Sequence, residues 1–343
     1  MNPILSLIMT IKTEEAQSVA DAFSFLDELC EADREKIDLS LICNCESTGF
    51  AQSAQAYVTE RGLEMRLYQS RHKGMGSEIH SSIKDAAGEW YMLLSGDDRL
   101  NAGAFSKFLH VLRPDYLPAT VGIVAYNVLE EEVDDEWQTM SLERIFPMAF
   151  KPYEWEELKR FSRSRLFTMN NSVFRTKLLK KAPLRMPEGS DLAEYVYSYL
   201  LLPYVKHLYY ANYDVRYSVP TAGNGGGEDI TDKVDDLLRI TRMLYDVYRL
   251  EDDVRDESQR EYMYTYLTAI VSTAALSLLE KEDEEYYDRL EKLWRWMRRV
   301  DRAMYRRVRS NILYIINHMS KDRWRILRRQ GIKLSKRFLT LNH

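Results

Sequence analysis

Two adjacent carboxylates, Asp97 and Asp98, follow an apolar stretch at residues 89–94 whose composition predicts a buried β-strand. If that strand belongs to a parallel sheet, its carboxyl end faces the crevice in which such sheets bind ligands. Paired carboxylates there can hold a hard divalent cation, Mg²⁺ or Mn²⁺, which takes phosphate oxygens as further ligands. Such a cation would offset the charge of a departing diphosphate. The structural alternative is an ordinary turn, because Gly96, Asp97 and Asp98 are also good turn residues.

The first hundred residues alternate predicted strands with predicted helices. We expect strands at residues 4–11, 38–43, 63–68 and 89–94, and helices at residues 14–31, 51–61 and 76–87. Later strands are expected at residues 121–128 and 207–217, and later helices at residues 171–181 and 191–202. Residues 130–155 are acidic and aromatic and predict irregular structure. Alternating strands and helices predict an α/β fold with a mainly parallel sheet covered on both faces.

A glycine-rich loop at residues 221–228 precedes a region that has helical periodicity almost throughout. The backbone N–H groups of this loop could cradle a phosphate, or the loop could serve as a hinge. It is not a P-loop, because no Gly-Lys-Ser/Thr follows it. We therefore expect an α/β domain at residues 1–220 and a helical C-terminal region at residues 221–343.

The cysteines and the N-terminus favour a cytoplasmic protein. The chain contains three cysteines, a sparse and odd set without the spacing of a disulfide framework or a zinc site. The apolar run at residues 4–11 has no basic residue before it and is too short for a signal peptide. Residues 262–279 carry no charge but include three Thr and two Ser and have acidic flanks, which favours a buried helix over a membrane-spanning one.

The net charge of −5 conceals a strong asymmetry. Residues 292–337 contain sixteen Lys and Arg against two Asp, whereas the rest of the chain is acidic. Apolar side chains recur there at helical spacing, at Leu293, Met297, Val300, Met304, Val308, Ile312, Ile315 and Met319, opposite Arg298, Arg299, Arg302, Arg306 and Arg309. This basic amphipathic tail could contact anionic lipid headgroups as a peripheral membrane surface, or form a structural or homo-oligomer helix with a solvated face. Because no nucleic-acid-binding module accompanies the charge, we expect no nucleic-acid partner.

Residues 70–98 resemble the family 2 glycosyltransferases of the GT-A fold. Residues 87–98, AGEWYMLLSGDD, stand where that family has A-x-G-E-Y-I-x-F-L-D-x-D-D. Residues 5–12 look like its S-I-I-I-P-T-Y-N strand, and residues 41–49 look like I-I-V-D-D-G-S-T-D. The resemblance covers residues 1–105 and implies an inverting transferase with a nucleotide-sugar donor, a UDP-sugar being favoured. It also implies a donor half at residues 1–105 and an acceptor half at residues 106–220.

The resemblance implies a donor site built from several elements. Its residues would be Thr10, Asn44, Lys73 and Gly74 beside the nucleoside, and Ser95, Asp97, Asp98 and Arg216 at the diphosphate. Asp97 and Asp98 would bind Mg²⁺ or Mn²⁺. Arg216 lies in a stretch similar to the family's late Y-x-Y-R strand, where it could reach the diphosphate or form a structural ion pair.

The same resemblance implies a base on the acceptor side. Residues 187–195 look like the family's P-E-G-x-x-E-D-x-x-F stretch, in which an Asp deprotonates the acceptor hydroxyl. Asp191 is therefore the candidate base, with Glu194 as the alternative. Asp191 could instead cap the helix that follows. The implied acceptor is a glycan or lipid-linked glycan in surface polysaccharide synthesis.

Four positions depart from the family pattern, and one of them is Gly49, which replaces a later Asp of that pattern. Asn44 and Cys45 replace its paired aspartates, and Ser95 replaces the first Asp of its D-x-D motif. Asn44 can still hydrogen-bond a nucleobase, but it is not a charged acceptor. These departures support a second hypothesis, a non-catalytic nucleotide-sugar-binding or scaffold protein on the same fold. A nucleotidyltransferase ranks lower, because residues 10–14 lack the glycine-rich basic loop of that class.

Overall fold

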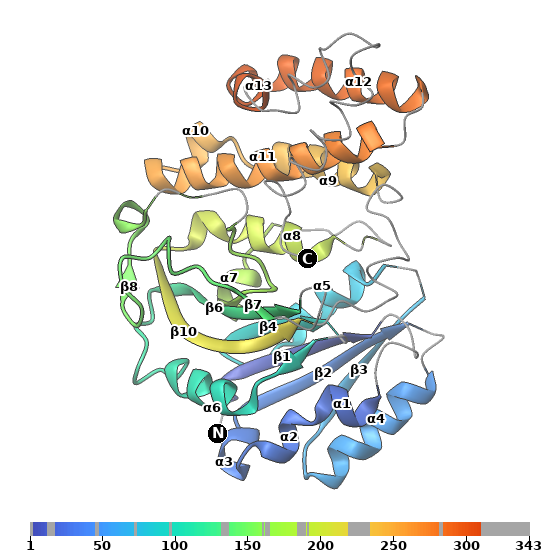
Figure 1. Cartoon of the computed structure of the whole chain (residues 1–343), viewed down its shortest axis with the longest axis vertical. Coiled ribbons are helices and arrows are strands. Elements are labelled where there is room, and N and C mark those ends of the chain that lie inside the picture. Colours follow the sequence, from blue (N-terminus) through green and yellow to red (C-terminus); the bar gives the residue numbers. More distant parts are fainter. Residues whose placement is uncertain are drawn as a thin grey trace. The chain divides into compact units, whose positions relative to one another are not determined.

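A computed structural model describes most of the chain, namely residues 3–11, 18–44, 48–71, 74–95, 98–131, 137–159, 161, 165–183, 190, 192–218, 234–280 and 284–309. The chain forms two compact units, coloured by sequence in Figure 1. The first comprises Met1–Lys159 and Phe167–Gly227, and the second comprises Arg160–Leu166 and Glu228–His343. The domain boundary expected at residue 220 lies within residues 219–233, which are outside the described residues.

A mixed sheet forms the centre of the first unit. Its strands are β1 (Leu5–Ile11), β2 (Ile37–Asn44), β3 (Met65–Ser70), β4 (Trp90–Ser95), β5 (Arg99–Leu100), β6 (Val121–Glu131), β7 (Trp137–Met140), β8 (Pro152–Tyr153), β9 (Ser172–Arg175) and β10 (His207–Ser218). They follow the order β3-β2-β1-β4-β9-β6-β10-β5, while β7 pairs with β6 and β8 pairs with β10. The long strands pair in parallel, β1 with β2 and β4, β2 with β3, and β6 with β10. The predicted α/β fold with a mainly parallel sheet is therefore confirmed.

Helices cover both faces of this sheet. They are α1 (Val19–Phe23), α2 (Phe25–Glu28), α3 (Glu31–Arg34), α4 (Thr48–Glu60), α5 (Gly76–Asp85), α6 (Ala102–Val111), α7 (Thr176–Leu179) and α8 (Ala193–Leu200). Figure 1 shows α1, α2 and α4 on one face and α5 on the other. Because strand side chains alternate between faces, Leu5, Leu7 and Met9 of β1 join one core with Phe23 and Phe105.

The single helix predicted at residues 14–31 is wrong. Residues 18–31 instead contain α1, α2 and the start of α3, and residues 14–17 lie outside the described residues. Ser24 separates the first two helices, and its hydroxyl donates to the carbonyl of Asp21 at 3.1 Å. Leu29 and Cys30 are extended. The apolar spacing was compatible with one helix, but a serine that bonds nearby backbone offers the chain an alternative to helix continuation.

The helix predicted at residues 171–181 is also partly wrong. Its first half is β9, which pairs antiparallel with β4 on one side and β6 on the other. Only α7 is helical. Val173 and Phe174, both fully buried, are residue types that pack well on a sheet, so the tertiary setting overrode a short and ambiguous helical pattern.

Gly88 allows β4 to enter the sheet beside β1. Its N–H donates to the Ser6 hydroxyl at 2.8 Å. A Cβ at this position would lie 2.3 Å from the backbone nitrogen of Ser6, which is too close for any side chain. The glycine of the 87–89 turn is therefore required by the close approach of two strands, and it sets the register that brings the end of β4 to the end of β1.

The second unit consists of helices α9 (Val234–Val247), α10 (Leu250–Asp253), α11 (Glu257–Glu280), α12 (Glu284–Val300) and α13 (Arg302–Arg309). α11 is its core helix, and Tyr262, Tyr266 and Val271 are fully buried, as predicted for residues 262–279. Within the described ranges, no helix combines the length and apolarity needed to cross a membrane.

The basic amphipathic tail is not one continuous helix. Asp301 ends α12 and caps α13, since its carboxylate accepts the N–H of Met304 at 2.8 Å. Leu293 and Met297 of α12 and Met304 and Val308 of α13 are buried, as the predicted apolar stripe requires, but Val300 at the end of α12 is 51% exposed and does not join that buried side. The rest of the predicted stripe, beyond residue 309, lies outside the described residues.

Candidate functional site

The carboxyl ends of β1, β2 and β4 bring predicted donor-site residues to one edge of the sheet. Thr10 lies opposite Ser95 in the register of β1 and β4. Asn44 ends β2 and lies opposite Ser70 at the end of β3. The Ser70 hydroxyl donates to the carbonyl of Gly74 at 3.2 Å, which holds Gly74 beside the same edge. Thr10, Asn44 and Ser95 are half-buried residues, and the Thr10 hydroxyl donates to the carbonyl of Leu94 at 3.5 Å.

Other predicted site residues are outside the described part of the chain. These are Lys73 beside the nucleoside, Asp97 at the diphosphate and Asp191 as the base. Cys45 and the glycine-rich loop at residues 221–228 are also outside it.

Asp98 is buried and closes the turn that follows β4. Its backbone N–H donates to the Ser95 carbonyl at 3.0 Å, and the Ser95 N–H donates to Asp98 Oδ2 at 3.1 Å. The same Oδ2 accepts a hydrogen bond from the guanidinium of Arg216 and forms an ion pair with it. Burial raises the pKa of Asp98, because desolvation disfavours its charged form more strongly than Arg216 favours it. Asp98 is thus directed into the protein, toward Arg216.

Arg216 is held on both of its terminal nitrogens. One terminal nitrogen (Nη2) donates to Asp98, and the other (Nη1) donates to the backbone and side-chain oxygens of Asn170, at 2.9 and 3.3 Å. Burial acts to lower the pKa of Arg216, but Asp98 and Tyr126 outweigh it and raise that pKa, so the guanidinium stays charged. The sequence left open whether Arg216 reaches the diphosphate or forms a structural ion pair. In the structure Arg216 forms the ion pair, with Asp98.

The predicted metal site can be compared with the side chains at this edge. Among the described residues, no group of three or more His, Cys, Asp or Glu side chains could hold a metal ion. Asp98 is the described member of the predicted metal pair, and its carboxylate is engaged by Arg216 and the Ser95 N–H. The described residues do not by themselves form the expected Mg²⁺ or Mn²⁺ site, and that prediction now depends on Asp97.

Sequence reasoning missed Asn170. Its backbone carbonyl accepts from Arg216 and also from the Tyr126 hydroxyl, at 3.1 Å. Asn170 lies in the turn that leads into β9, so its hydrogen bonds with Arg216 connect this turn to β10. The only sequence signal was a pair of asparagines before an apolar stretch, which is more often a turn.

A second polar network was also missed. The Asn127 side-chain amide donates to Asn212 at 2.8 Å and to Asp214 at 3.0 Å, and the Tyr210 hydroxyl donates to Asn127 at 2.6 Å. It spans an irregularity in the pairing of β10 with β6 between Tyr210 and Asp214. The network therefore holds together the irregular part of β10 that directly precedes Arg216.

Comparison with known proteins identifies the fold. No family model matches the chain, and no curated protein matches it in sequence. Among solved structures, S. aureus TarS 1-349 in complex with UDP-GlcNAc is similar with a TM-score of 0.67 and 12% identity, covering 98% of this chain and 91% of that one. The same protein in complex with UDP has a TM-score of 0.56 at 13% identity, covering 89% and 90%.

The chain has the GT-A-type glycosyltransferase fold. This confirms the fold predicted from the resemblance of residues 1–105. The structural similarity to TarS also covers the helical C-terminal region. A mannosyltransferase from Pyrobaculum calidifontis, PcManGT, solved with GDP-Man and Mn²⁺, is more distant, with a TM-score of 0.47 and 14% identity over 94% of this chain and 89% of that chain. At these identities the likeness concerns the fold, and the activity is a separate matter.

Proposed function

We propose that this chain is an inverting glycosyltransferase that moves a sugar from a nucleotide-diphosphate donor to a hydroxyl of a glycan or lipid-linked glycan in surface polysaccharide synthesis. The observation that carries the proposal is the similarity in fold, over 98% of the chain, to a protein solved with UDP-GlcNAc. A UDP-sugar is therefore the donor to test first. We assign the reaction to the cytoplasm, with the basic C-terminal helices available for peripheral contact with a membrane.

The donor would lie at the sheet edge formed by β1, β2 and β4. Thr10 and Asn44 would face the nucleoside, where the Asn44 amide can pair with a nucleobase edge, and Lys73 and Gly74 would flank it. Ser95 would face the diphosphate. Asp97 would contact a Mg²⁺ or Mn²⁺ ion, which when bound offsets the charge of the leaving nucleoside diphosphate.

Asp98 and Arg216 have a positioning role in this proposal. Their buried ion pair ties Asp98, which follows Asp97 directly in the sequence, to β10, and Asp98 also accepts the N–H of Ser95. A catalytic carboxylate must be held within a fraction of an ångström of its productive position. We infer that the pair provides this hold, while Asp97 makes the contact with the metal ion.

Asp191 would remove the proton from the acceptor hydroxyl as that hydroxyl attacks the anomeric carbon. In-line attack by the acceptor inverts the configuration of the sugar. Glu194, a half-buried residue in the first turn of α8, is the alternative base.

The direct test is the Asp97→Ala variant, assayed with UDP-, GDP- and CMP-sugars in the presence of Mn²⁺. We expect transfer and donor hydrolysis to disappear while the unfolding midpoint stays unchanged. Glu64→Ala, which removes an exposed carboxylate of the same unit, is the matched control and should keep full activity. Full activity of Asp97→Ala would remove the metal-site assignment.

A non-catalytic nucleotide-sugar-binding or scaffold protein is the second candidate. It is favoured by the departures at Asn44, Cys45 and Ser95, and by the engagement of Asp98 with Arg216. Calorimetry with the same donors separates the candidates. Binding without turnover supports a degenerate binding protein, and absence of binding to any donor supports a scaffold.

A further inference from the structure

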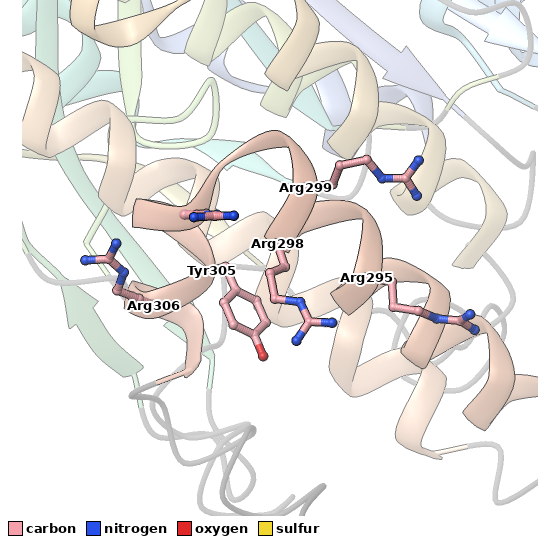
Figure 2. A pocket seen from close by; sticks show the side chains of 6 residues that line it. Arg295, Arg298, Arg299, Tyr305 and Arg306 are labelled. Atoms are coloured by element: carbon pink, nitrogen blue, oxygen red, sulfur yellow. The ribbon is translucent and has the colours of Figure 1, made fainter.

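Helices α12 and α13 form a hollow of about 640 Å³ that is lined almost entirely by arginines. Its lining residues are Arg295, Arg298, Arg299, Arg302, Tyr305 and Arg306, shown in Figure 2. The five arginines are exposed, and Tyr305 is half-buried. The volume falls within the range of roughly 300–1,000 Å³ that ligand sites occupy. We call this feature the arginine hollow.

Packing of the two helices creates this concentration of charge. Leu293 and Met297 on α12, and Met304 and Val308 on α13, are buried, so the arginines remain on the outer side of each helix. The break at Asp301 allows α13 to change direction while its side chains still line the same hollow as those of α12.

The charge in the hollow is nearly uncompensated. Among the described residues, Arg298, Arg299, Arg302 and Arg306 form no ion pair with any carboxylate. The remaining arginine, Arg295, lies 3.8 Å from an Asp288 oxygen, but that carboxylate already pairs with Lys292 at 2.6 Å.

Some other arginines of the same unit have partners, whereas Arg242 and Arg255 have no ion-pair partner among the described residues. Arg289 pairs with Asp235, and Arg307 pairs with Glu261. The sequence after residue 309 supplies a single acidic side chain, Asp322, among many basic ones. Uncompensated positive charge is therefore concentrated at the hollow, although the unit contains many carboxylates elsewhere.

Arginine side chains gathered in this way repel one another unless an anion lies between them. Figure 2 shows Arg295, Arg299 and Arg306 extending outward from their helices. Arg298 lies beside the Tyr305 ring, with its guanidinium carbon 5.9 Å from the ring centroid. A guanidinium presents a planar fork of donors that matches two phosphate oxygens at once.

We propose that the arginine hollow binds the phosphate groups of a ligand. The source of those groups is either a lipid headgroup or a soluble phosphate-bearing molecule, and both would engage the same guanidinium groups. None of these residues belongs to the predicted donor site, so the proposal stands apart from the proposed sugar transfer.

The first experiment is calorimetric titration of the full chain with sodium tripolyphosphate, without divalent metal. We compare Arg298→Gln/Arg302→Gln with the matched control Arg242→Gln/Arg255→Gln, which removes two exposed arginines of the same unit that have no ion-pair partner among the described residues. The hollow variant should lose on the order of tenfold or more in affinity, because two charged hydrogen-bonding groups are removed. The control should bind as the wild type does. Since tripolyphosphate can also enter a nucleotide site, the contrast between the two variants decides the result.

The second experiment measures sedimentation of the same proteins with vesicles of phosphatidylglycerol and phosphatidylcholine, and with vesicles of phosphatidylcholine alone. Binding to the anionic vesicles that is lost only in the hollow variant identifies a lipid headgroup as the source. Tripolyphosphate binding that is lost only in the hollow variant, without vesicle binding, identifies a soluble ligand. The proposal is overturned if the wild type binds neither probe, or if the hollow and control variants behave alike.

Discussion

Arg216 and the arginines of the hollow carry the same charge in opposite surroundings. Arg216 is 4% exposed and is paired with the buried Asp98, whereas Arg298 and Arg302 are exposed and have no carboxylate partner among the described residues. Removing a guanidinium from water is so costly that a buried one needs a fixed counter-charge. An exposed one is stabilised by water and remains available to a ligand. Burial therefore separates an arginine that positions a turn from arginines that can bind an anion.

The largest expected effect comes from breaking the buried pair. Asp98→Ala leaves the Arg216 guanidinium buried without its counter-charge and should lower the free energy of unfolding by about 3–5 kcal/mol. Urea denaturation followed by circular dichroism measures this change. Asp115→Ala, which removes an exposed carboxylate of the same unit, serves as the control and should leave the free energy of unfolding nearly unchanged. Equal losses in the two variants would show that the pair is not buried as described.

Removing both members of the pair should restore part of that stability. In Asp98→Ala/Arg216→Met no unpaired charge remains inside the protein, so we expect recovery on the order of 2 kcal/mol relative to Asp98→Ala alone. The same denaturation assay completes a double-mutant cycle with Arg216→Met. Strict additivity of the two single changes would contradict a direct interaction between the side chains.

The exposed ion pair between Arg307 and Glu261 should contribute less to stability than the buried Asp98–Arg216 pair, but more than the unpaired arginines of the hollow. Arg307 bonds both carboxylate oxygens of Glu261, and the two side chains are 38% and 51% exposed. Arg307→Gln should therefore lower the free energy of unfolding by only about 0.2–1 kcal/mol, and less in high salt. Urea titrations at low and high salt measure both effects. A loss of unfolding free energy comparable to that of Asp98→Ala would mean that exposure does not control the strength of these ion pairs.

The smallest effect on stability is expected in the hollow. Arg298→Gln/Arg302→Gln removes exposed and mutually repelling charges, so the free energy of unfolding should change by less than about 0.5 kcal/mol. Thermal unfolding without phosphate, alongside the Arg242→Gln/Arg255→Gln control, measures the difference. A clear destabilisation would show that these arginines support the fold instead of remaining available for an anion.

Much of the fold was predictable because its information is local. Strands β1 and β4 are apolar runs, and α5 has a clear amphipathic spacing, so their existence follows from the pattern of neighbouring residues. The errors lie where local patterns are ambiguous. Residues 14–31 have helical spacing but are interrupted at Ser24, and β9 becomes a strand because β4 and β6 offer it hydrogen-bonding partners on both sides.

The candidate site was also predictable only in part. The sequence was enough to predict that Thr10, Asn44 and Ser95 lie at the same edge of the sheet, because the carboxyl ends of parallel strands meet at one edge. The partner of Asp98 could not be deduced, because Arg216 is 118 residues away in the chain and Asn170, which holds it, has no distinctive pattern.

The sequence by itself determined which segments are apolar and where basic residues gather. Only the tertiary structure decided which charges are buried with a partner and which stay exposed without one. The physical reason is that hydrophobic periodicity acts over neighbouring residues, whereas the state of a charged group depends on its desolvation and on the groups that distant parts of the chain place beside it.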